Sequence, residues 1–187
     1  MWCFFIGGKM NIWLKEISLE DGLEFCDLLI ELASYDEAYA KPVTSDFSTD
    51  DYEFFKKARV QMAKGTNLPQ NVFPTSSFWV MNNEEVIGYA TLRHEIDPAK
   101  PGGHLGCCLK RSFQNKGIGT IVSNLLSDIA YNKLGITQLV YTAKDENIQS
   151  QKSLEKIGAK LVSVHDGYHF YVEDLEIKLA NKEGRKL

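Results

Sequence analysis

The hydrophobic pattern of the chain is most regular between residues 117 and 133. Apolar residues recur there at spacings of three and four, which places them on one face of an α-helix. These positions are Ile118, Ile121, Val122, Leu125, Leu126, Ile129 and Ala130. The pattern predicts an amphipathic helix of about 25 Å, at 1.5 Å per residue, with Gly135 as its C-terminal cap.

Hydrophobic and turn residues predict further elements on both sides of this helix. Strands are predicted at 11–17, 77–81, 86–96, 103–110, 137–143, 160–165 and 168–179. Helices are predicted at 18–33, at 49–64 and from 148 up to Gly158, with a Ser18–Asp21 capping box, Ser48 and Asn147 at their starts. This order predicts an α/β (α+β) protein in which a mixed sheet carries helices on both faces.

The first ten residues, MWCFFIGGKM, do not continue this pattern. Their apolar run is shorter than the core of a signal peptide and too short to span a bilayer. We expect residues 1–9 to be an unstructured leader, with packing against the body as the alternative, and residues 10–187 to form one domain. No other segment suggests export, so the sequence predicts a cytoplasmic protein.

Composition excludes several classes of protein. The chain has 187 residues, of which 44% are hydrophobic, and a net charge of -4, which argues against disorder and against general nucleic-acid binding. Its cysteines show no C-x-x-C spacing, so neither a metal site nor a disulfide framework is predicted. We expect them to be buried, with an acyl-cysteine intermediate at Cys107 or Cys108 as the alternative.

The turn before the central helix carries the most specific chemistry. The first turn of a helix leaves backbone N–H groups without partners and attracts anions. Gly117 and Gly119 have no Cβ to hold a phosphate away from those amides, and Lys110, Arg111 and Lys116 add positive charge. The segment therefore predicts a pyrophosphate cradle.

Two motifs identify the family that the chain resembles. Residues 114–119, QNKGIG, match the [QR]-x-x-G-x-[GA] acyl-CoA loop of the GNAT superfamily of N-acyltransferases. Residues 147–159, NIQSQKSLEKIGA, are similar to the N-x-x-[AS]-x-x-x-Y-x-K-x-G-F segment of that family. The resemblance implies a mostly antiparallel sheet of about seven strands, with acetyl-CoA as acyl donor. The strings GYATLRHEI and GGHLG also resemble bacterial members of unassigned function.

The resemblance also implies a set of cofactor contacts. Backbone amides from Asn115 to Thr120 would hold the pyrophosphate, and strand atoms from Leu109 to Arg111 would hold the pantetheine arm. Asn147 has two open roles, as a helix cap or as a contact near that arm. The predicted cofactor-binding residues are Leu109, Lys110, Arg111, Gln114, Asn115, Lys116, Gly117, Ile118, Gly119, Thr120, Asn147 and Ser150.

Acyl transfer to an amine requires a base and a donor for the developing oxyanion. We predict His104 as the base because histidine titrates near neutrality, with a structural or solvent-facing histidine as the alternative. Glu95 is the reserve base, with His94 behind it. The family places a backbone N–H donor before the cofactor loop, which implies Cys108 or Leu109 here.

The family's general acid is a tyrosine, and Leu154 stands at its position. Tyr168, Tyr141 or water would then protonate the leaving thiolate, unless it leaves unaided.

These residues support two main hypotheses. The first is an N-acetyltransferase that moves acetyl from acetyl-CoA to a primary amine by direct attack in a ternary complex. The second is a non-catalytic acyl-CoA sensor of the same fold, and a site for another phosphorylated ligand is a weaker third. Acidic residues between 35 and 53 would attract a cationic small-molecule or protein amine, or form a solvated surface. No nucleic-acid or membrane partner is predicted, and the family resemblance allows a homodimer.

Overall fold

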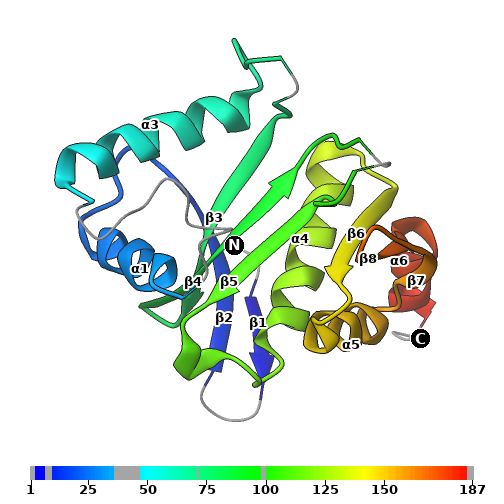
Figure 1. The fold of residues 1–187 in the computed structure, drawn as a ribbon. Coiled ribbons are helices and arrows are strands. Elements are labelled where there is room, and N and C mark those ends of the chain that lie inside the picture. Colours follow the sequence, from blue (N-terminus) through cyan, green and yellow to red (C-terminus); the bar gives the residue numbers. More distant parts are fainter. Residues whose placement is uncertain (1–2, 7–9, 36–46, 71, 98–99, 185–187) are drawn as a thin grey trace.

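The structure, a computed structural model, describes residues 3–6, 10–35, 47–70, 72–97 and 100–184. The eight strands in these ranges form two antiparallel sheets, in the orders β1-β2-β3-β4-β5 and β6-β8-β7 (Figure 1). The strands are β1 (Cys3–Ile6), β2 (Met10–Glu16), β3 (Thr75–Asn82), β4 (Glu85–Arg93), β5 (Leu105–Leu109), β6 (Gln138–Lys144), β7 (Lys160–His165) and β8 (Tyr168–Asp174).

Helices cover both faces of the larger sheet. They are α1 (Glu24–Ala33), α3 (Thr49–Lys64), α4 (Ile118–Leu134), α5 (Ile148–Ile157) and α6 (Leu175–Gly184), with a 3-10 turn η1 (Arg111–Phe113). α1 and α3 pack on β4 and β3 at one face, and α4 packs on β2, β4 and β5 at the other (Figure 1). The predicted α/β class with helices on both faces is confirmed, with the strands divided between two sheets.

The apolar face of α4 forms the larger hydrophobic core, as its spacing predicts. The seven positions named from the pattern are all buried there, together with residues of β2, β3, β4 and β6. Gly135 caps the helix in the left-handed conformation, at φ 67°. A second core lies under α1 and α3, where Trp79 stacks on Phe25 with ring centroids 4.8 Å apart.

The two sheets are joined by hydrogen bonds between His104, just before β5, and Val140 of β6. His104 N–H donates to the Val140 carbonyl at 2.8 Å, and Val140 N–H donates to His104 Nδ1 at 3.0 Å. Gly103 has φ 55°, and a Cβ there would lie 2.6 Å from the Val140 oxygen, so the close approach requires glycine. Beyond this junction β5 and β6 belong to different sheets, and the space between them is available for a ligand.

The predicted helix at 18–33 begins later than its capping box suggests. Ser18 and Asp21 do form the expected local bonds, with Ser18 N–H donating to the Asp21 carboxylate at 3.0 Å, but α1 starts at Glu24. The same carboxylate also accepts from Trp79 Nε1 at 2.7 Å and from Lys15. Asp21 is therefore the centre of a buried tertiary network, and the prediction of a helix from Ser18 is wrong.

Two further expectations about strand ends need correction, and one helix leaves an aromatic side chain exposed. The strand predicted at 168–179 ends at Asp174, whose Oδ1 accepts from Ile177 N–H at 3.0 Å and so caps α6. The strand predicted at 86–96 ends at Arg93. α3 has the predicted bounds and Ser48 cap, but it buries Tyr52 and Phe55 and leaves Phe54 71% exposed.

The expected leader overlaps one described element. Residues 3–6 form β1, which pairs with residues 10–13 of β2. The remaining leader residues, 1–2 and 7–9, lie outside the described ranges, as do residues 36–46 of the acidic stretch.

Candidate functional site

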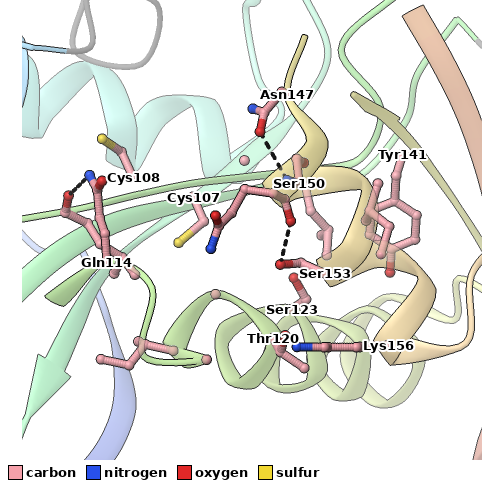
Figure 2. Close-up of a pocket in the computed structure, with 18 of the residues that line it drawn as sticks. Cys107, Cys108, Gln114, Thr120, Ser123, Tyr141, Asn147, Ser150, Ser153 and Lys156 are labelled. Atoms are coloured by element: carbon pink, nitrogen blue, oxygen red, sulfur yellow. Dashed lines mark hydrogen bonds between the residues drawn. The ribbon is translucent and has the colours of Figure 1, made fainter. Parts of the chain in front are cut away.

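The candidate site is a pocket of about 530 Å³ at the place where β5 and β6 separate. Its walls come from β5, the loop after η1, the first turns of α4, part of β6, and α5 (Figure 2). Strand atoms from Leu105 to Leu109 form one side, and Asn147, Ser150 and Leu154 of the α5 region form the other. The pocket is therefore an elongated space between two sheets with a helix start at its border.

The start of α4 is open towards this pocket. Its N-cap is Gly117, at φ 77°, and no side chain caps the helix. A Cβ added at Gly117 or Gly119 would meet no atom within 4 Å, so the space beside these amides is empty of protein. Uncapped amides with the positive end of the helix dipole favour an anionic group, and a phosphate fits here.

The loop that leads into α4 is fixed by its own side chains. Gln114 Nε2 donates to the Leu109 carbonyl at 2.9 Å, and Asn115 takes a left-handed conformation at φ 60°. Phe113 N–H donates to the Lys110 carbonyl at 2.8 Å, which closes the η1 turn. The loop therefore presents its amides in a fixed arrangement.

Strand pairing decides which β5 amides can reach the pocket. Lys110 N–H donates to the Ile87 carbonyl, and Arg93 N–H donates to the His104 carbonyl, so the even-numbered positions of β5 are hydrogen-bonded to β4. Cys108 is paired with Tyr89 in that register, and its N–H points at β4. The amides of Cys107 and Leu109 point the other way, towards the gap.

The α5 wall combines a helix cap with the substituted tyrosine position. Asn147 Oδ1 accepts from Ser150 N–H at 3.0 Å, which is the bond of an N-cap. Leu154 is buried, lines the pocket and belongs to the core around α4. The pocket thus has an apolar side chain where the resembled family has a phenol.

Tyr141 lines the pocket, but its hydroxyl is turned into a buried network. It donates to Glu173 Oε2 at 2.5 Å, Ser127 donates to the same oxygen at 3.1 Å, and Lys178 Nζ lies 2.6 Å from Glu173 Oε1. Burial first, and then the Glu173 charge, raise the pKa of Tyr141 well above its usual value. The phenol therefore stays protonated and bound to Glu173.

Cys107 presents its thiol at the pocket (Figure 2). Burial raises the pKa of this thiol to about 12. At that pKa only on the order of one molecule in 100,000 carries a thiolate at pH 7. The side chain of Cys108 points to the opposite face, into the core under α1 and α3.

Most of the predicted cofactor residues are brought together here. Nine line the pocket: Leu109, Gln114, Asn115, Gly117, Ile118, Gly119, Thr120, Asn147 and Ser150. The three basic residues do not. Lys110 Nζ is 3.4 Å from Glu85, Arg111 stacks on the Tyr35 ring at 4.6 Å, and Lys116 lies over the Phe113 ring at 5.4 Å.

The two predicted bases and Tyr168 lie outside the pocket lining. His104 is buried at the junction of β5 and β6, where burial lowers its pKa, and Glu95 is exposed in the bend after β4. Tyr168 begins β8, opposite Lys144 and His165. Cys108 contributes to the lining while its amide faces β4.

Several lining residues were not among the predicted cofactor contacts, although those of α5 lie within the 147–159 motif. They include Ser123 of α4 and Gln149, Ser153 and Lys156 of α5. Hydroxyl residues recur three apart at Thr120 and Ser123 and again at Ser150 and Ser153, which places each pair on one helix face. The spacing predicts a polar face on each of the two helices, but it does not show that these two faces lie on the same pocket.

Other kinds of site find no support within the described ranges. No group of three histidine, cysteine or acidic side chains there is arranged to hold a metal ion. No helix in those ranges is long and apolar enough to cross a membrane.

Solved structures share this fold at low sequence identity. The Campylobacter jejuni N-acetyltransferase PseH in complex with acetyl coenzyme A is 17% identical, with a TM-score of 0.58, over 87% of this chain and 98% of that chain. RimL, a ribosomal L7/L12 alpha-N-protein acetyltransferase in complex with coenzyme A, is 14% identical, with a TM-score of 0.66, over 92% and 98%. A Vibrio cholerae spermidine N-acetyltransferase SpeG chimera is 16% identical, with a TM-score of 0.63, over 90% and 98%.

Sequence comparison assigns the family. No curated protein sequence matches the chain. Residues 12–160, which include both motifs and the whole pocket lining, match the acetyltransferase (GNAT) domain. The chain therefore belongs to the GNAT family, and it is an acyltransferase whose acyl donor is acetyl-CoA.

Proposed function

We propose that this enzyme transfers acetyl from acetyl-CoA to a primary amine by direct attack in a ternary complex. The observation that carries the proposal is the continuity of one pocket, which runs from the uncapped start of α4 along the β5 edge that faces β6. Such a pocket can hold the phosphates of the donor at one end and its thioester between the strands. The acceptor then meets a thioester carbonyl that is already held in place. Holding the two reactants together lowers the entropic part of the activation barrier.

Direct attack is favoured over a cysteine intermediate by the state of Cys107. A thiol whose pKa is about 12 is a poor nucleophile at neutral pH, because only the thiolate attacks a thioester. No histidine or acidic side chain lies among the described pocket-lining residues to take its proton. The acetyl group therefore passes directly to the amine, without an acyl-enzyme intermediate.

The oxyanion donor in this proposal is the amide of Cys107 or Leu109. Both amides point away from β4 towards the gap, whereas the Cys108 amide faces Tyr89. A fixed amide that meets the developing negative charge stabilises the transition state without reorganisation. The sequence analysis named the amides of Cys108 and Leu109 as candidate donors. The strand register keeps Leu109 as a candidate and replaces Cys108 with Cys107.

Removal of the amine proton is the most demanding requirement. An amine of pKa near 10.4 costs about 4 to 5 kcal/mol to deprotonate at pH 7. His104 can serve only if it gives up a hydrogen bond, because its Nδ1 lone pair accepts from Val140 N–H and the neutral ring then carries its proton on Nε2. Glu95, acting through water, is therefore the better candidate within this proposal.

The leaving thiolate receives its proton from water or leaves unaided. Tyr141 is held by Glu173 with a raised pKa, Tyr168 lies outside the pocket lining, and Leu154 cannot donate. A thiol of pKa near 8.5 is a tolerable leaving group, so the reaction does not depend on a strong acid.

An amine acceptor is consistent with the structural neighbours. RimL is named for a protein alpha-amine and SpeG for spermidine, and both are amines. Asp50, exposed in the first turn of α3, would attract a cationic acceptor, whereas the Glu53 carboxylate lies 2.7 Å from Lys56 Nζ. A cytoplasmic location and a homodimer stay predictions.

The second candidate is an acyl-CoA sensor without turnover. Leu154 at the tyrosine position and the engaged Nδ1 of His104 favour it specifically. In this case the same pocket would bind acetyl-CoA, and its occupancy would be the output.

A thiol-release assay with a panel of amines tests the proposal, together with calorimetric binding of acetyl-CoA. Turnover that requires both substrates, and falls in Glu95→Gln with unchanged acetyl-CoA affinity, supports the enzyme and its base. If turnover falls in His104→Gln but not in Glu95→Gln, His104 rather than Glu95 is the base. Tight acetyl-CoA binding without amine-dependent release across polyamines, amino acids and peptide N-termini would favour the sensor.

A further inference from the structure

We infer that strand β7 is an interface at which two copies of this chain pair, with β7 of one copy antiparallel to β7 of the other. β7 is the outer strand of the smaller sheet, whose order is β6-β8-β7 (Figure 1). It contributes no residue to the described lining of the pocket, so the interface is separate from the proposed acetyl transfer.

The side chains of β7 are unusually exposed for a strand. All six of its residues are exposed, whereas β6 and β8 each bury three. Three of the six are large aliphatic residues, Leu161 at 51% exposure, Val162 at 59% and Val164 at 53%. Aliphatic side chains that gather on one exposed strand, rather than lying scattered over the surface, mark an interaction site.

The backbone of β7 is also open on one side. β7 pairs with β8, and within the described ranges no strand pairs with its other edge. An edge strand points alternate N–H and C=O groups away from its single neighbour, where a further strand can bond them. Proline or central charged residues often prevent such pairing, but β7 contains no proline and its one lysine is its first residue.

A β-bulge sorts the side chains of this strand between its two faces. The pairing of β7 with β8 shifts between Leu161 and Ser163, so the residue between them is extra. Leu161 pairs with Tyr171 and Val164 pairs with His169, two residues apart on β8. Leu161 and Val164 therefore share one face, although their spacing of three would put them on opposite faces of a regular strand.

A second copy of β7 is complementary to this arrangement. Residues directly opposite each other in an antiparallel pair share a face, so Leu161 of each copy can lie opposite Val164 of the other. The same register places Lys160 opposite His165 of the second copy, whose Nδ1 is 3.1 Å from the exposed Asp166 carboxylate. Apolar side chains then meet apolar side chains, and the Lys160 ammonium meets an anion, twice across one two-fold axis. This self-complementarity favours a second copy as the occupant.

Such a dimer leaves both pockets open. It joins the two three-stranded sheets edge to edge, with β6 of each copy at the outer ends. Because the pocket is lined from β6 and not from β7, dimerisation and acetyl-CoA binding are expected to be independent. Failure of one would therefore not remove the other.

Sedimentation velocity over a concentration series tests the interface in wild type, Val164→Lys and Phe54→Lys. Phe54 is the matched control, because it is 71% exposed on α3, which packs on the larger sheet at the opposite side of the molecule (Figure 1). We expect a wild-type dimer with a dissociation constant in the micromolar range, since the interface is small. Val164→Lys should raise that constant at least about tenfold, because a lysine on an edge strand opposes pairing, and Phe54→Lys should leave it unchanged.

A wild type that stays monomeric throughout the series would overturn the interface. A dimer that persists in Val164→Lys, or one that is lost in Phe54→Lys instead, would overturn it as well.

Cysteine cross-linking tests the register independently of affinity. Residues opposite each other in an antiparallel pair have Cβ atoms about 5 Å apart, close enough for a disulfide. Under mild oxidation, a mixture of the single variants Leu161→Cys and Val164→Cys should give a linked dimer, and each variant alone should give no more than wild type. Equal linking in the mixture and in either variant alone would contradict the proposed register.

Discussion

Helices α3 and α4 are similar in length and begin in opposite ways. α3 is closed by a capping box, in which Ser48 Oγ accepts from Asp51 N–H and the Asp51 carboxylate accepts from Ser48 N–H at 2.9 Å. α4 begins at Gly117 without any side-chain cap. Since unsatisfied first-turn amides cost stability, the open start of α4 is a feature that a ligand can use, while the closed start of α3 serves only the fold.

Substitution of Gly119 by glutamate should have the largest effect. The added side chain enters the space beside the α4 amides, where it meets no protein atom, and its charge repels a phosphate. We expect CoA affinity to fall at least 100-fold, about 2.7 kcal/mol, with the free energy of unfolding unchanged or slightly raised by the acid in the first turn. Calorimetry and urea denaturation would measure the two quantities, and unaltered affinity would place the anion elsewhere.

Gly117→Ala and Gly135→Ala form a matched pair at the two ends of α4. Both glycines are left-handed, at φ 77° and 67°, and both face open space. Each substitution should lower the free energy of unfolding by about 1 to 2 kcal/mol, because the left-handed conformation is unfavourable with a Cβ. Only Gly117→Ala should also weaken CoA binding. An equal loss of CoA affinity in both variants would mean that the effect comes from helix stability and not from contact with the ligand.

Ser48→Ala opens the closed helix. We expect the free energy of unfolding to fall by about 1 kcal/mol, the usual cost of losing an N-cap. CoA affinity should stay unchanged, because Ser48 does not line the pocket. A drop in affinity would mean that α3 and the pocket are coupled.

Asn147→Ser, at the start of α5, separates the two roles of Asn147, as a helix cap and as a contact to the bound donor. Serine caps about as well as asparagine, so stability should change by less than about 0.5 kcal/mol. The lost amide donor should reduce CoA affinity roughly fivefold if it bonds the bound donor, in line with one hydrogen bond of about 1 kcal/mol. Equal affinities in calorimetry would leave Asn147 as a cap alone.

The smallest effect concerns pH. The Ser48 hydroxyl and amide bonds hold the pKa of Asp51 below its usual value of 3.8. This contribution to stability is present above that value and is lost as the pH falls through the lower folded pKa. The stability advantage of wild type over Asp51→Asn at pH 7 should therefore shrink as the pH falls below 3.8 in denaturation curves, and an advantage that stays constant through the acid range would contradict it.

Local signals predicted the helix ends that local bonds determine. Ser48, Gly135 and Asn147 all cap as their spacing indicates. The Ser18–Asp21 box has equally good spacing and does not start a helix, since its carboxylate is drawn to Trp79, 58 residues away in sequence. A short-range pattern cannot show that a distant side chain competes for the same oxygen.

The residues of the candidate site show the same difference between local signals and tertiary contacts. The glycine loop and the Asn147 segment were predictable because each is a contiguous motif that lines the pocket. Ser123 lies outside both motifs and shares the pocket with α5 because α5 packs on α4, and the pairing of β5 with β4 directs the Cys107 amide, rather than the Cys108 amide, towards the gap. These placements depend on tertiary contacts that no spacing in the sequence contains.

The buried Glu173 network links the pocket wall to α6, the last helix of the chain. Its counter-ion is Lys178 of α6, and its other partners are Tyr141 in the pocket wall and Ser127 of α4. Removal of the chain after residue 175 would leave a buried carboxylate without its cation, at a cost of about 3 to 5 kcal/mol. The tolerance of this enzyme to C-terminal truncation therefore ends at α6, even though no residue of that helix is among the described residues that line the pocket.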